Sequence, residues 1–405
     1  MKIAFVYDAV YPWMKGGGEK GLWDIAVSLR ERGHEVHMFC LQFWDGPATL
    51  EREGVVMHGV RRAGEFYRPD GRRSLSEPLL FAAGLYRSLR RENGFDFIYC
   101  IVFPFFSVFS VWLHRLISGR RTPWIIAWLE IWGRKYWNAY TRSRCLGAVG
   151  AGIEWLSARC CRNHTVLSEL GAQRLTSLLG VPRKNIRVIP RGLHLDRLPG
   201  DAVRQPQRVL YAGRLFAYKN TSVVVEAWPA VVARCPGAKL RILGTGPELE
   251  RLQHLRSSLG LTEAIEFVTP HDSWEEAMKE IAAAEILVQP STREGQSVIV
   301  LEAMAVGTTV IGARHPESAV SDFVRHGKNG WLVDAWDVPS AWAAPLISLL
   351  KNEPLRRELQ ETAQRDARGF DWNAEIVPSL ERAFADCVAE ASGESREVVL
   401  SPRST

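Results

Sequence analysis

The 405-residue sequence predicts an α/β protein with two doubly wound domains, each built on a parallel sheet. Two observations lead to this class. A strand pattern, a glycine-rich loop, an amphipathic helix pattern and a second strand pattern follow one another in the first forty residues, and the same order begins again after residue 205. Strand and helix patterns then continue to alternate, which is typical of parallel strands joined by crossover helices.

The N-terminal βαβ unit begins with an apolar strand, Ile3 to Tyr7. A loop containing Gly16, Gly17 and Gly18 leads into a helix whose apolar residues recur at helical spacing from Leu22 to Leu29. Gly33 then ends that helix before a second strand, Glu35 to Phe39.

The C-terminal βαβ unit has the same organisation. A strand from Arg208 to Gly213 precedes a helix containing Val223 to Val232, and a strand from Lys239 to Gly244 follows. The later expected segments are Ile265 to Val268, Trp274 to Ala284, Ile286 to Val288, Ser297 to Ala305, Thr309 to Ile311, Ser340 to Leu350 and Ala374 to Ala391.

Composition shifts give the domain boundaries. The stretch from Pro190 to Pro206 is rich in proline, glycine and charge and has no sustained apolar period. We expect an N-terminal domain over 1–195, a linker over 196–206, a C-terminal domain over 207–370, a C-terminal helix over 371–391 and a disordered tail over 392–405.

Cysteine use and hydropathy indicate a cytoplasmic protein. Seven cysteines without a Cys-x-x-Cys pair fit neither a disulfide framework nor a zinc site. The N-terminus reaches Asp8 too early for the apolar core of a signal peptide. The longest apolar stretch, Ile101 to Leu113, contains Pro104 and is shorter than the ~20 residues of a spanning helix.

Charge is divided unevenly along the chain. Residues 1–200 contain 29 Lys and Arg against 17 Asp and Glu, whereas residues 201–405 contain 22 against 28. A basic N-terminal half suits a phosphorylated acceptor, acidic lipid headgroups or nucleic acid, and ordinary solvated arginines are the alternative. No compact basic and aromatic recognition motif supports nucleic acid, so we expect none as a partner.

The chemistry is expected at the carboxyl edges of the two sheets, where parallel α/β domains bind ligands. Arg214 and Lys219 follow the first C-terminal strand, and Gly244 follows the next. Glu294 lies in a loop before Ser297, which opens a helix, and Glu302 follows inside that helix. Two cations and helix N-terminal amides can hold a diphosphate, and two carboxylates can accept hydrogen bonds from hydroxyls. These are the parts of a sugar-nucleotide site, although each motif alone is nonspecific.

The chain resembles the retaining glycosyltransferases of family 4, the group that includes glycogen synthase and mannosyltransferases. The likeness covers almost the whole length. It rests on Gly16-Gly17, on Ala212-Gly-Arg214-Leu with Lys219, on Gly244-Thr-Gly-Pro-Glu248, on Glu294 with seven residues before Glu302, on His326 to Val333, and on Phe370-Asp-Trp372. It implies the GT-B fold, in which two Rossmann-like domains face each other across a cleft, with the last helix returning to the N-terminal domain.

The resemblance also implies roles for individual residues. Arg214 and Lys219 would hold the donor diphosphate, Ser297 and Val298 would offer amides to it, Glu302 would bind the ribose, and Glu294 would contact the transferred sugar. The complete expected donor-binding set is Gly16, Gly17, Gly18, Gly213, Gly244, Gly295, Gln296, Ser297, Val298 and Glu302. The implied reaction uses no metal and no cofactor besides a nucleotide sugar, of which UDP and GDP sugars are the leading candidates.

Two positions depart from the family pattern. Many members have a histidine close to the sugar, and this sequence has Leu129 at the corresponding place. The neighbouring Glu130 could line the acceptor side instead, or it could be a structural glutamate beside a tryptophan. In the linker, Arg191 stands where the family has asparagine, which could alter packing or add a cation.

Three functions stay open on these residues. The leading hypothesis is a retaining hexosyltransferase, and the alternatives are a GT-B sugar-nucleotide epimerase and a non-catalytic donor-binding subunit. The acceptor is a lipid-linked molecule, a glycan or a small metabolite. Basic clusters surround the aromatic run from Phe103 to Trp112 and suit a peripheral site on an anionic membrane surface; they are Arg61-Arg62, Arg72-Arg73, Arg87 to Arg91, Arg115 and Arg120-Arg121. The alternative is a soluble acceptor with the aromatic run in the core, which is the commoner place for such runs.

Overall fold

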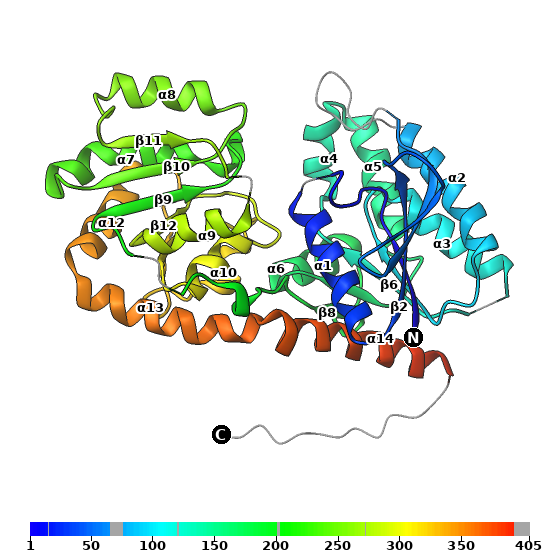
Figure 1. Cartoon of the computed structure of the whole chain (residues 1–405). Helices are drawn as coiled ribbons and strands as arrows, with labels where there is room; N and C mark the ends of the chain where they lie inside the picture. Colours follow the sequence, from blue (N-terminus) through cyan, green and yellow to red (C-terminus); the bar gives the residue numbers. More distant parts are fainter. Residues whose placement is uncertain (15, 65–75, 120, 201–202, 272, 393–405) are drawn as a thin grey trace. The chain divides into compact units, whose positions relative to one another are not determined.

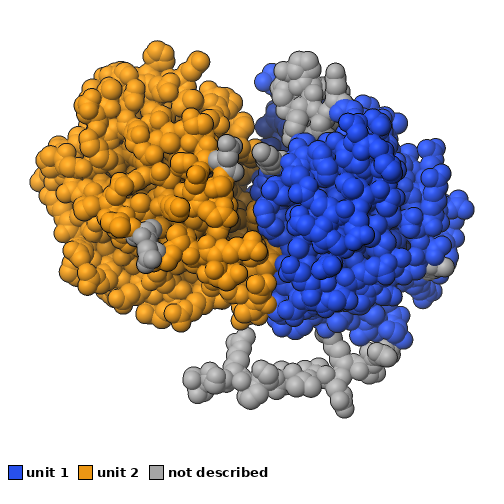
Figure 2. All heavy atoms as spheres, viewed as in Figure 1, with its two compact units in different colours: residues 1–167, 171–189, 377–405 blue, residues 168–170, 190–376 orange. Residues whose placement is uncertain are grey.

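A computed structural model gives the fold of the chain. It describes all residues except 15, 65–75, 120, 201–202, 272 and 393–405. The described chain divides into two compact units (Figure 2), unit 1 comprising 1–167, 171–189 and the C-terminal segment from 377, and unit 2 comprising 168–170 and 190–376. The expected disordered tail, apart from Ser392, and the basic residues Arg72, Arg73 and Arg120 lie outside the described residues.

Unit 1 is built on an eight-stranded sheet in the order β3-β4-β2-β1-β5-β6-β7-β8. Figure 1 shows both units as ribbons, with β2, β6 and β8 of this sheet labelled. Its pairs are parallel except for the edge pair of β3 and β4. The strands are β1 (Lys2–Val6), β2 (Glu35–Gln42), β3 (Thr49–Arg52), β4 (Val55–Arg62), β5 (Phe97–Ile101), β6 (Trp124–Trp128), β7 (His164–Val166) and β8 (Ile186–Val188). The helices are α1 (Gly17–Glu31), α2 (Ser76–Arg91), α3 (Phe106–Ile117), α4 (Gly133–Thr141), α5 (Arg144–Ser157), α6 (Glu169–Leu179) and α14 (Val377–Ser392).

Unit 2 is built on a six-stranded parallel sheet in the order β11-β10-β9-β12-β13-β14. Its strands are β9 (Arg208–Ala212), β10 (Lys239–Leu243), β11 (Ile265–Val268), β12 (Ile286–Gln289), β13 (Thr309–Ala313) and β14 (Trp331–Val333). Its helices are α7 (Thr221–Arg234), α8 (Leu249–Ser258), α9 (Trp274–Ala283), α10 (Val298–Ala305), α11 (Val320–Phe323), α12 (Pro339–Lys351) and α13 (Glu353–Ala367).

Both sheets are buried on both faces, which is why their strands are continuous apolar runs. In unit 2, one face of β9 packs under Trp228 of α7 and Trp342 of α12, while Leu210 on the other face packs towards α10. The predicted fold class, two doubly wound parallel-sheet domains, is confirmed. The antiparallel edge strand β3 is a difference from the expectation of purely parallel sheets, and its short connection to β4 allows that pairing.

The last helix, α14, groups with unit 1 and is attached to its first βαβ unit. Glu381 accepts hydrogen bonds from Arg32 at 2.9 Å and from His34 at 3.0 Å. The ring of Phe384 stacks on Phe97 of β5, with centroids 4.4 Å apart. Among the residues that the structure describes, no helix has both the length and the apolar character needed to cross a membrane.

A fully buried carboxylate organises the segment after β6. Glu154 of α5 accepts hydrogen bonds from the backbone amides of Trp132 at 2.7 Å and Gly133 at 2.9 Å, and from the Trp137 indole at 2.9 Å. Burial raises the pKa of Glu154, and the three donors oppose that effect. The side chain therefore fixes the loop that carries Glu130 and Trp132.

This raised pKa predicts a pH-dependent contribution to stability. A carboxyl with a raised folded-state pKa contributes most below its unfolded value of 4.5 and loses that contribution as pH rises through the folded value. We expect the difference in urea unfolding midpoint, wild type minus Glu154→Gln, to decrease as the pH rises above about 4.5. Subtracting the variant removes the titration of all other groups, and a difference that stays constant or grows would contradict the assignment.

Candidate active site at the carboxyl edge of unit 2

Two loops far apart in sequence meet at the carboxyl edge of the unit 2 sheet. Strand β12 pairs with β9 in parallel, with Ile286 opposite Val209 and Leu287 opposite Leu210. The loop after each strand therefore emerges at the same edge. Thr292 donates to the backbone carbonyl of Tyr218 through its amide at 2.9 Å and through its hydroxyl at 3.0 Å.

Glu294 forms an ion pair with Lys219 at the meeting point of these loops. The Lys219 Nζ lies 2.5 Å from Oε1 of Glu294, and both side chains are nearly buried. Gln289, the last residue of β12, donates from Nε2 to the same Glu294 oxygen at 3.0 Å. A cation and an amide thus fix this carboxylate, and its Oε2 accepts no hydrogen bond from the described residues.

The backbone of Glu294 is also fixed. It forms an isolated parallel bridge with Ser318, in which the Glu294 amide donates to the Glu317 carbonyl at 3.2 Å and the Ala319 amide donates to the Glu294 carbonyl at 2.9 Å. The side chain therefore projects from a loop with little freedom. Such rigidity is what a group that orients a substrate needs.

Ser297 and Val298 begin α10, as expected from the sequence. Ser297 is the N-cap residue but is buried, and its Oγ accepts from Nε2 of Gln289 at 2.6 Å instead of capping the helix amides. A helix that begins without a side-chain cap keeps donors in its first turn that can meet an anion.

Glu302 lies inside α10, where its Oε1 accepts a hydrogen bond from the Trp274 indole at 2.7 Å. Burial raises the pKa of Glu302, while the Trp274 hydrogen bond and the positive charge of Arg191 lower it. Arg191 in the segment before β9 therefore adds a cation to the surroundings of Glu302.

Arg214 and Lys219 each contact an aromatic ring of their own loop, Phe216 and Tyr218 respectively. The Arg214 guanidinium is 5.2 Å from the Phe216 ring centroid, and the Lys219 amine is 5.4 Å from that of Tyr218. These two rings stack with centroids 5.9 Å apart. Arg214 is exposed and forms no ion pair with any described carboxylate, which leaves its charge available to a ligand.

Gly213 and Gly244 pack against each other, in the loops after β9 and β10. A Cβ on Gly244 would lie 2.0 Å from the Gly213 carbonyl oxygen, and one on Gly246 would lie 2.4 Å from that of Leu215. The close approach of the two backbones thus requires glycine at these positions. Their presence needs no ligand to explain it.

Gln296 and Gly295 hold other parts of the unit. The Gln296 side chain forms two hydrogen bonds with the backbone of Arg191, accepting from its amide at 2.8 Å and donating to its carbonyl at 3.0 Å. The Ser168 hydroxyl donates to the Gly295 carbonyl at 2.7 Å. Both predicted donor-binding positions therefore have internal partners that shape the Glu294 loop.

The remaining predicted residues belong to unit 1. Gly16 is the N-cap of α1, where a Cβ would meet the Glu19 carboxylate, Gly17 is exposed, and a Cβ on Gly18 would lie 3.1 Å from Leu129 Cδ1. Leu129 at the end of β6 and the start of α1 are therefore neighbours. Glu130 accepts from the Trp132 indole at 3.2 Å, so it has the tryptophan partner of its structural interpretation.

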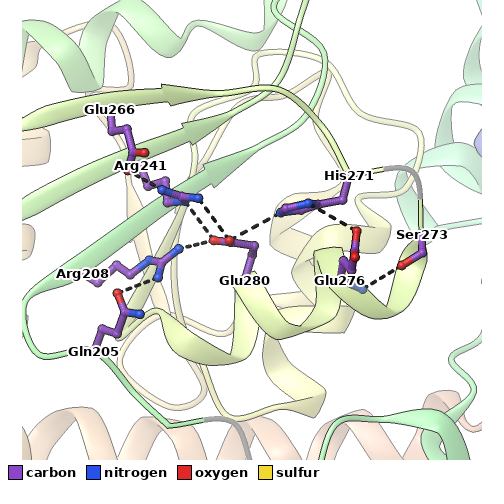
Figure 3. Close-up of polar contacts among 8 residues, drawn as sticks. All are labelled: Gln205, Arg208, Arg241, Glu266, His271, Ser273, Glu276 and Glu280. Atoms are coloured by element: carbon purple, nitrogen blue, oxygen red, sulfur yellow. Dashed lines mark hydrogen bonds and ion pairs between the residues drawn. The ribbon is translucent and has the colours of Figure 1, made fainter.

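A second charged cluster of unit 2 is neutralised internally (Figure 3). Glu280 of α9 contacts Arg208 of β9 and accepts from Arg241 of β10 at 3.0 Å. His271, in the loop before α9, lies 3.4 Å from Glu280 and 3.5 Å from Glu276. Because its cations and carboxylates pair with one another, this cluster connects α9 to the sheet and is not our candidate site.

Two family models match successive parts of the chain. The model described as "Glycosyl transferase 4-like domain" matches residues 16–192, and that described as "Glycosyl transferases group 1" matches residues 200–366. The chain belongs to glycosyltransferase family 4. The recognition made from the motifs is therefore confirmed.

Curated members of the family match part of the chain. The D-inositol 3-phosphate glycosyltransferase of Corynebacterium jeikeium (strain K411) is 34% identical over 209 residues, which are 47% of this chain and 49% of that protein. The protein of the same name from Acidothermus cellulolyticus is 32% identical over 239 residues, 54% of this chain and 52% of its own length. The chain thus spans about half the length of the curated relatives it matches.

Solved structures share the fold over nearly the full length. Sucrose-phosphate synthase from Thermosynechococcus elongatus has a TM-score of 0.75 at 20% identity, covering 96% of this chain and 99% of that chain. HepE from Anabaena, in complex with UDP-glucose, has a TM-score of 0.71 at 18% identity and covers 96% of this chain and all of its own. This family 4 glycosyltransferase therefore has the GT-B fold.

Sequence reasoning did not single out Gln289 or Trp274 as site residues. Gln289 does have a local signal, because a polar side chain ends the apolar strand Ile286 to Gln289 directly before Pro290. Trp274 has none, since a tryptophan at the start of a helix is usually core. Its contact with Glu302 depends on how α9 packs against α10.

The buried Gln289 predicts a stability effect without any ligand. Gln289→Leu removes both hydrogen bonds from Nε2 and leaves Ser297 and Glu294 without that donor, which we expect to destabilise the protein by about 1–3 kcal/mol. The measurement is urea unfolding of the whole chain. Gln253→Leu on α8 is the matched control and should change stability by less than about 0.5 kcal/mol; equal effects of the two variants would contradict the role of Gln289.

Proposed function

We propose that this family 4 glycosyltransferase transfers a hexose from a nucleotide-diphosphate sugar to a hydroxyl acceptor with retention of anomeric configuration. The observation that carries the proposal is the fixed Lys219 and Glu294 pair, which is on the same sheet edge as the Arg214 loop and the uncapped start of α10. Unit 2 is then the donor domain and unit 1 the acceptor domain.

The residues divide between the phosphates and the hydroxyls of the donor. Arg214, Lys219 and the amides at Ser297 and Val298 stabilise charge that develops on the diphosphate as the glycosidic bond breaks. Glu294 accepts from hydroxyls of the transferred sugar, and Glu302 accepts from the ribose. The Trp274 hydrogen bond occupies Oε1 of Glu302 and orients the carboxylate, so Oε2 is the oxygen that serves the ribose.

The bond changes balance without a protein nucleophile. The bond between the anomeric carbon and the diphosphate oxygen breaks, the bond to the acceptor oxygen forms on the same face of the sugar, and the acceptor proton passes to the leaving phosphate. Arg214 and Lys219 supply the positive charge that this departure needs, so the proposed reaction uses no metal. Leu129 is consistent with a reaction in which no imidazole takes the proton.

The donor and acceptor are proposed by class. A UDP sugar is the first donor to test, because HepE was solved with UDP-glucose, and a GDP sugar is the second. For the acceptor, an inositol phosphate joins the lipid-linked, glycan and small-metabolite alternatives, because the matched relatives carry that substrate in their name and the first 200 residues are basic. We place the reaction in the cytoplasm.

Radiolabelled donor and product analysis distinguish the three functions considered. Transfer of label to an acceptor or to water supports the proposal, because a transferase hydrolyses donor slowly when no acceptor is present. An isomerised donor would instead identify an epimerase. Donor binding without any product would identify a binding subunit.

Substitution of the two glutamates should separate binding from turnover. Glu302→Gln should weaken donor affinity about tenfold with a smaller effect on turnover. Glu294→Gln should lower turnover about 100-fold with a smaller effect on donor affinity. Thermal shift or calorimetry measures affinity, product formation measures turnover, and the exposed Glu250→Gln on α8 is the control; unchanged turnover in Glu294→Gln would contradict its role.

The ion pair also predicts that Lys219 and Glu294 act together. Each single substitution, Lys219→Met or Glu294→Gln, changes the position of the partner, so their effects on turnover should not add. We expect a coupling free energy of about 0.5–3 kcal/mol in the double-mutant cycle. Arg234→Ala, at the exposed end of α7, combined with Glu294→Gln should instead be additive, and an additive Lys219 cycle would show that the pair does not function as a unit.

A further inference from the structure

Exposed apolar side chains are concentrated on a few helices of unit 1. The described chain exposes 15 large hydrophobic side chains, and 11 of them belong to α2, α3, α5 and α6. Scattered exposed residues are ordinary for a folded protein, but such concentration marks a surface that meets something apolar.

On α3 the exposed residues follow a helical stripe. Trp112, Leu113, Leu116 and Ile117 are 41%, 38%, 64% and 60% exposed, while Val108 and Val111, nearer the start of the helix and turned towards the sheet, are buried in the core. The helix is thus apolar on both sides. The aromatic run that suggested a membrane surface in the sequence is itself largely inside, with Phe105 buried, and the exposed stripe begins where that run ends.

On α5 a second stripe has the same character. Leu146, Val149 and Leu156 are each exposed by half or more, and they recur at three and seven residues along one side of the helix. Trp155 is also exposed, and the Arg159 guanidinium lies 3.4 Å from its ring centroid. An aromatic ring paired with a cation at the end of an apolar stripe is typical of the boundary between lipid headgroups and acyl chains.

Topology puts the two stripes on one side of unit 1. Helix α3 connects β5 to β6 and α5 lies in the connection from β6 to β7, and these three strands are parallel neighbours in the sheet. Successive right-handed crossovers that advance in one direction lie on the same face of a sheet. The outward sides of α3 and α5 therefore belong to the same surface, which we name the α3/α5 face.

The charges on these helices have one sign. Among the described helices α2 to α5, the only acidic residues are Glu77 and Glu154, and both are buried. The exposed charged residues on the same helices are Arg87, Arg90, Arg91, Arg134, Lys135 and Arg144. Exposed apolar side chains can insert among the acyl chains of a bilayer, and the exposed cations on these helices can pair with anionic lipid headgroups. The helices therefore complement an anionic bilayer.

We infer that the α3/α5 face of unit 1 docks on an anionic lipid bilayer. A second copy of this chain fits the face poorly, because a symmetric contact would bring arginines against arginines with no exposed acid on these helices to pair with them. The inference does not depend on the transfer reaction. It identifies the surface that would bring unit 1 to an acceptor held in the membrane.

The test is co-sedimentation of the full chain with vesicles, without donor or acceptor. We expect binding to vesicles that contain phosphatidylglycerol, weaker binding to pure phosphatidylcholine vesicles, and reduced binding at high salt. The double variant Leu116→Glu/Ile117→Glu should bind ~10-fold more weakly or worse, because it places two anions at the apolar centre of the face. Val149→Glu should act in the same direction from the second stripe.

Leu259→Glu is the matched control, since Leu259 is an exposed leucine of unit 2 and should leave vesicle binding unchanged. Circular dichroism and donor binding should be equal in all variants, because the substituted side chains are on the surface. Wild-type binding that the α3 and α5 variants retain would overturn the inference, as would no binding by the wild type. Self-association without vesicles that the variants abolish would also overturn it and identify a protein interface.

Discussion

The parallel pairing of β9 with β12 is the constraint from which the candidate active site follows. With Ile286 opposite Val209, the loops after the two strands emerge together, and Lys219 reaches Glu294 across 75 positions of sequence. Burial on both sides of the sheet fixes this register, since shifting a strand by one residue would exchange its two faces. The ion pair is thus a result of core packing, and its geometry should be as stable as that core.

Each carboxylate of the site is oriented by a neutral donor from a neighbouring element. Gln289 of β12 donates a hydrogen bond to Glu294, and the Trp274 indole of α9 donates one to Glu302. In both cases Oε1 accepts the internal hydrogen bonds, and Oε2 accepts none from the described residues. This arrangement also divides the cations, because Lys219 is committed to Glu294 whereas Arg214 is exposed at the same edge.

The two units use charge differently. In unit 2 the residues around Glu280 pair with one another and stabilise the contact between α9 and the sheet. In unit 1 the few acids of α2 to α5 face inward, where Glu154 fixes the segment after β6, and the outward side is apolar and basic. Part of the positive balance of the first 200 residues therefore lies on helices that also expose leucine and tryptophan.

The sequence by itself determined the fold class, because the apolar periodicity and the glycines that end helices and strands are local properties. It also determined the family, because the spacing of Glu294 and Glu302 along the chain does not depend on packing. It also predicted a candidate site at the carboxyl edge of unit 2. The tertiary structure decided what the pattern leaves open. In the folded chain Lys219 forms an ion pair with Glu294, and Gly244 packs closely against the Gly213 backbone. The Gln296 side chain forms hydrogen bonds with the backbone of Arg191. Gln289 and Trp274 donate hydrogen bonds to Glu294 and Glu302. These contacts join residues from different strands and helices, so they depend on sheet order and helix packing, which no local pattern contains.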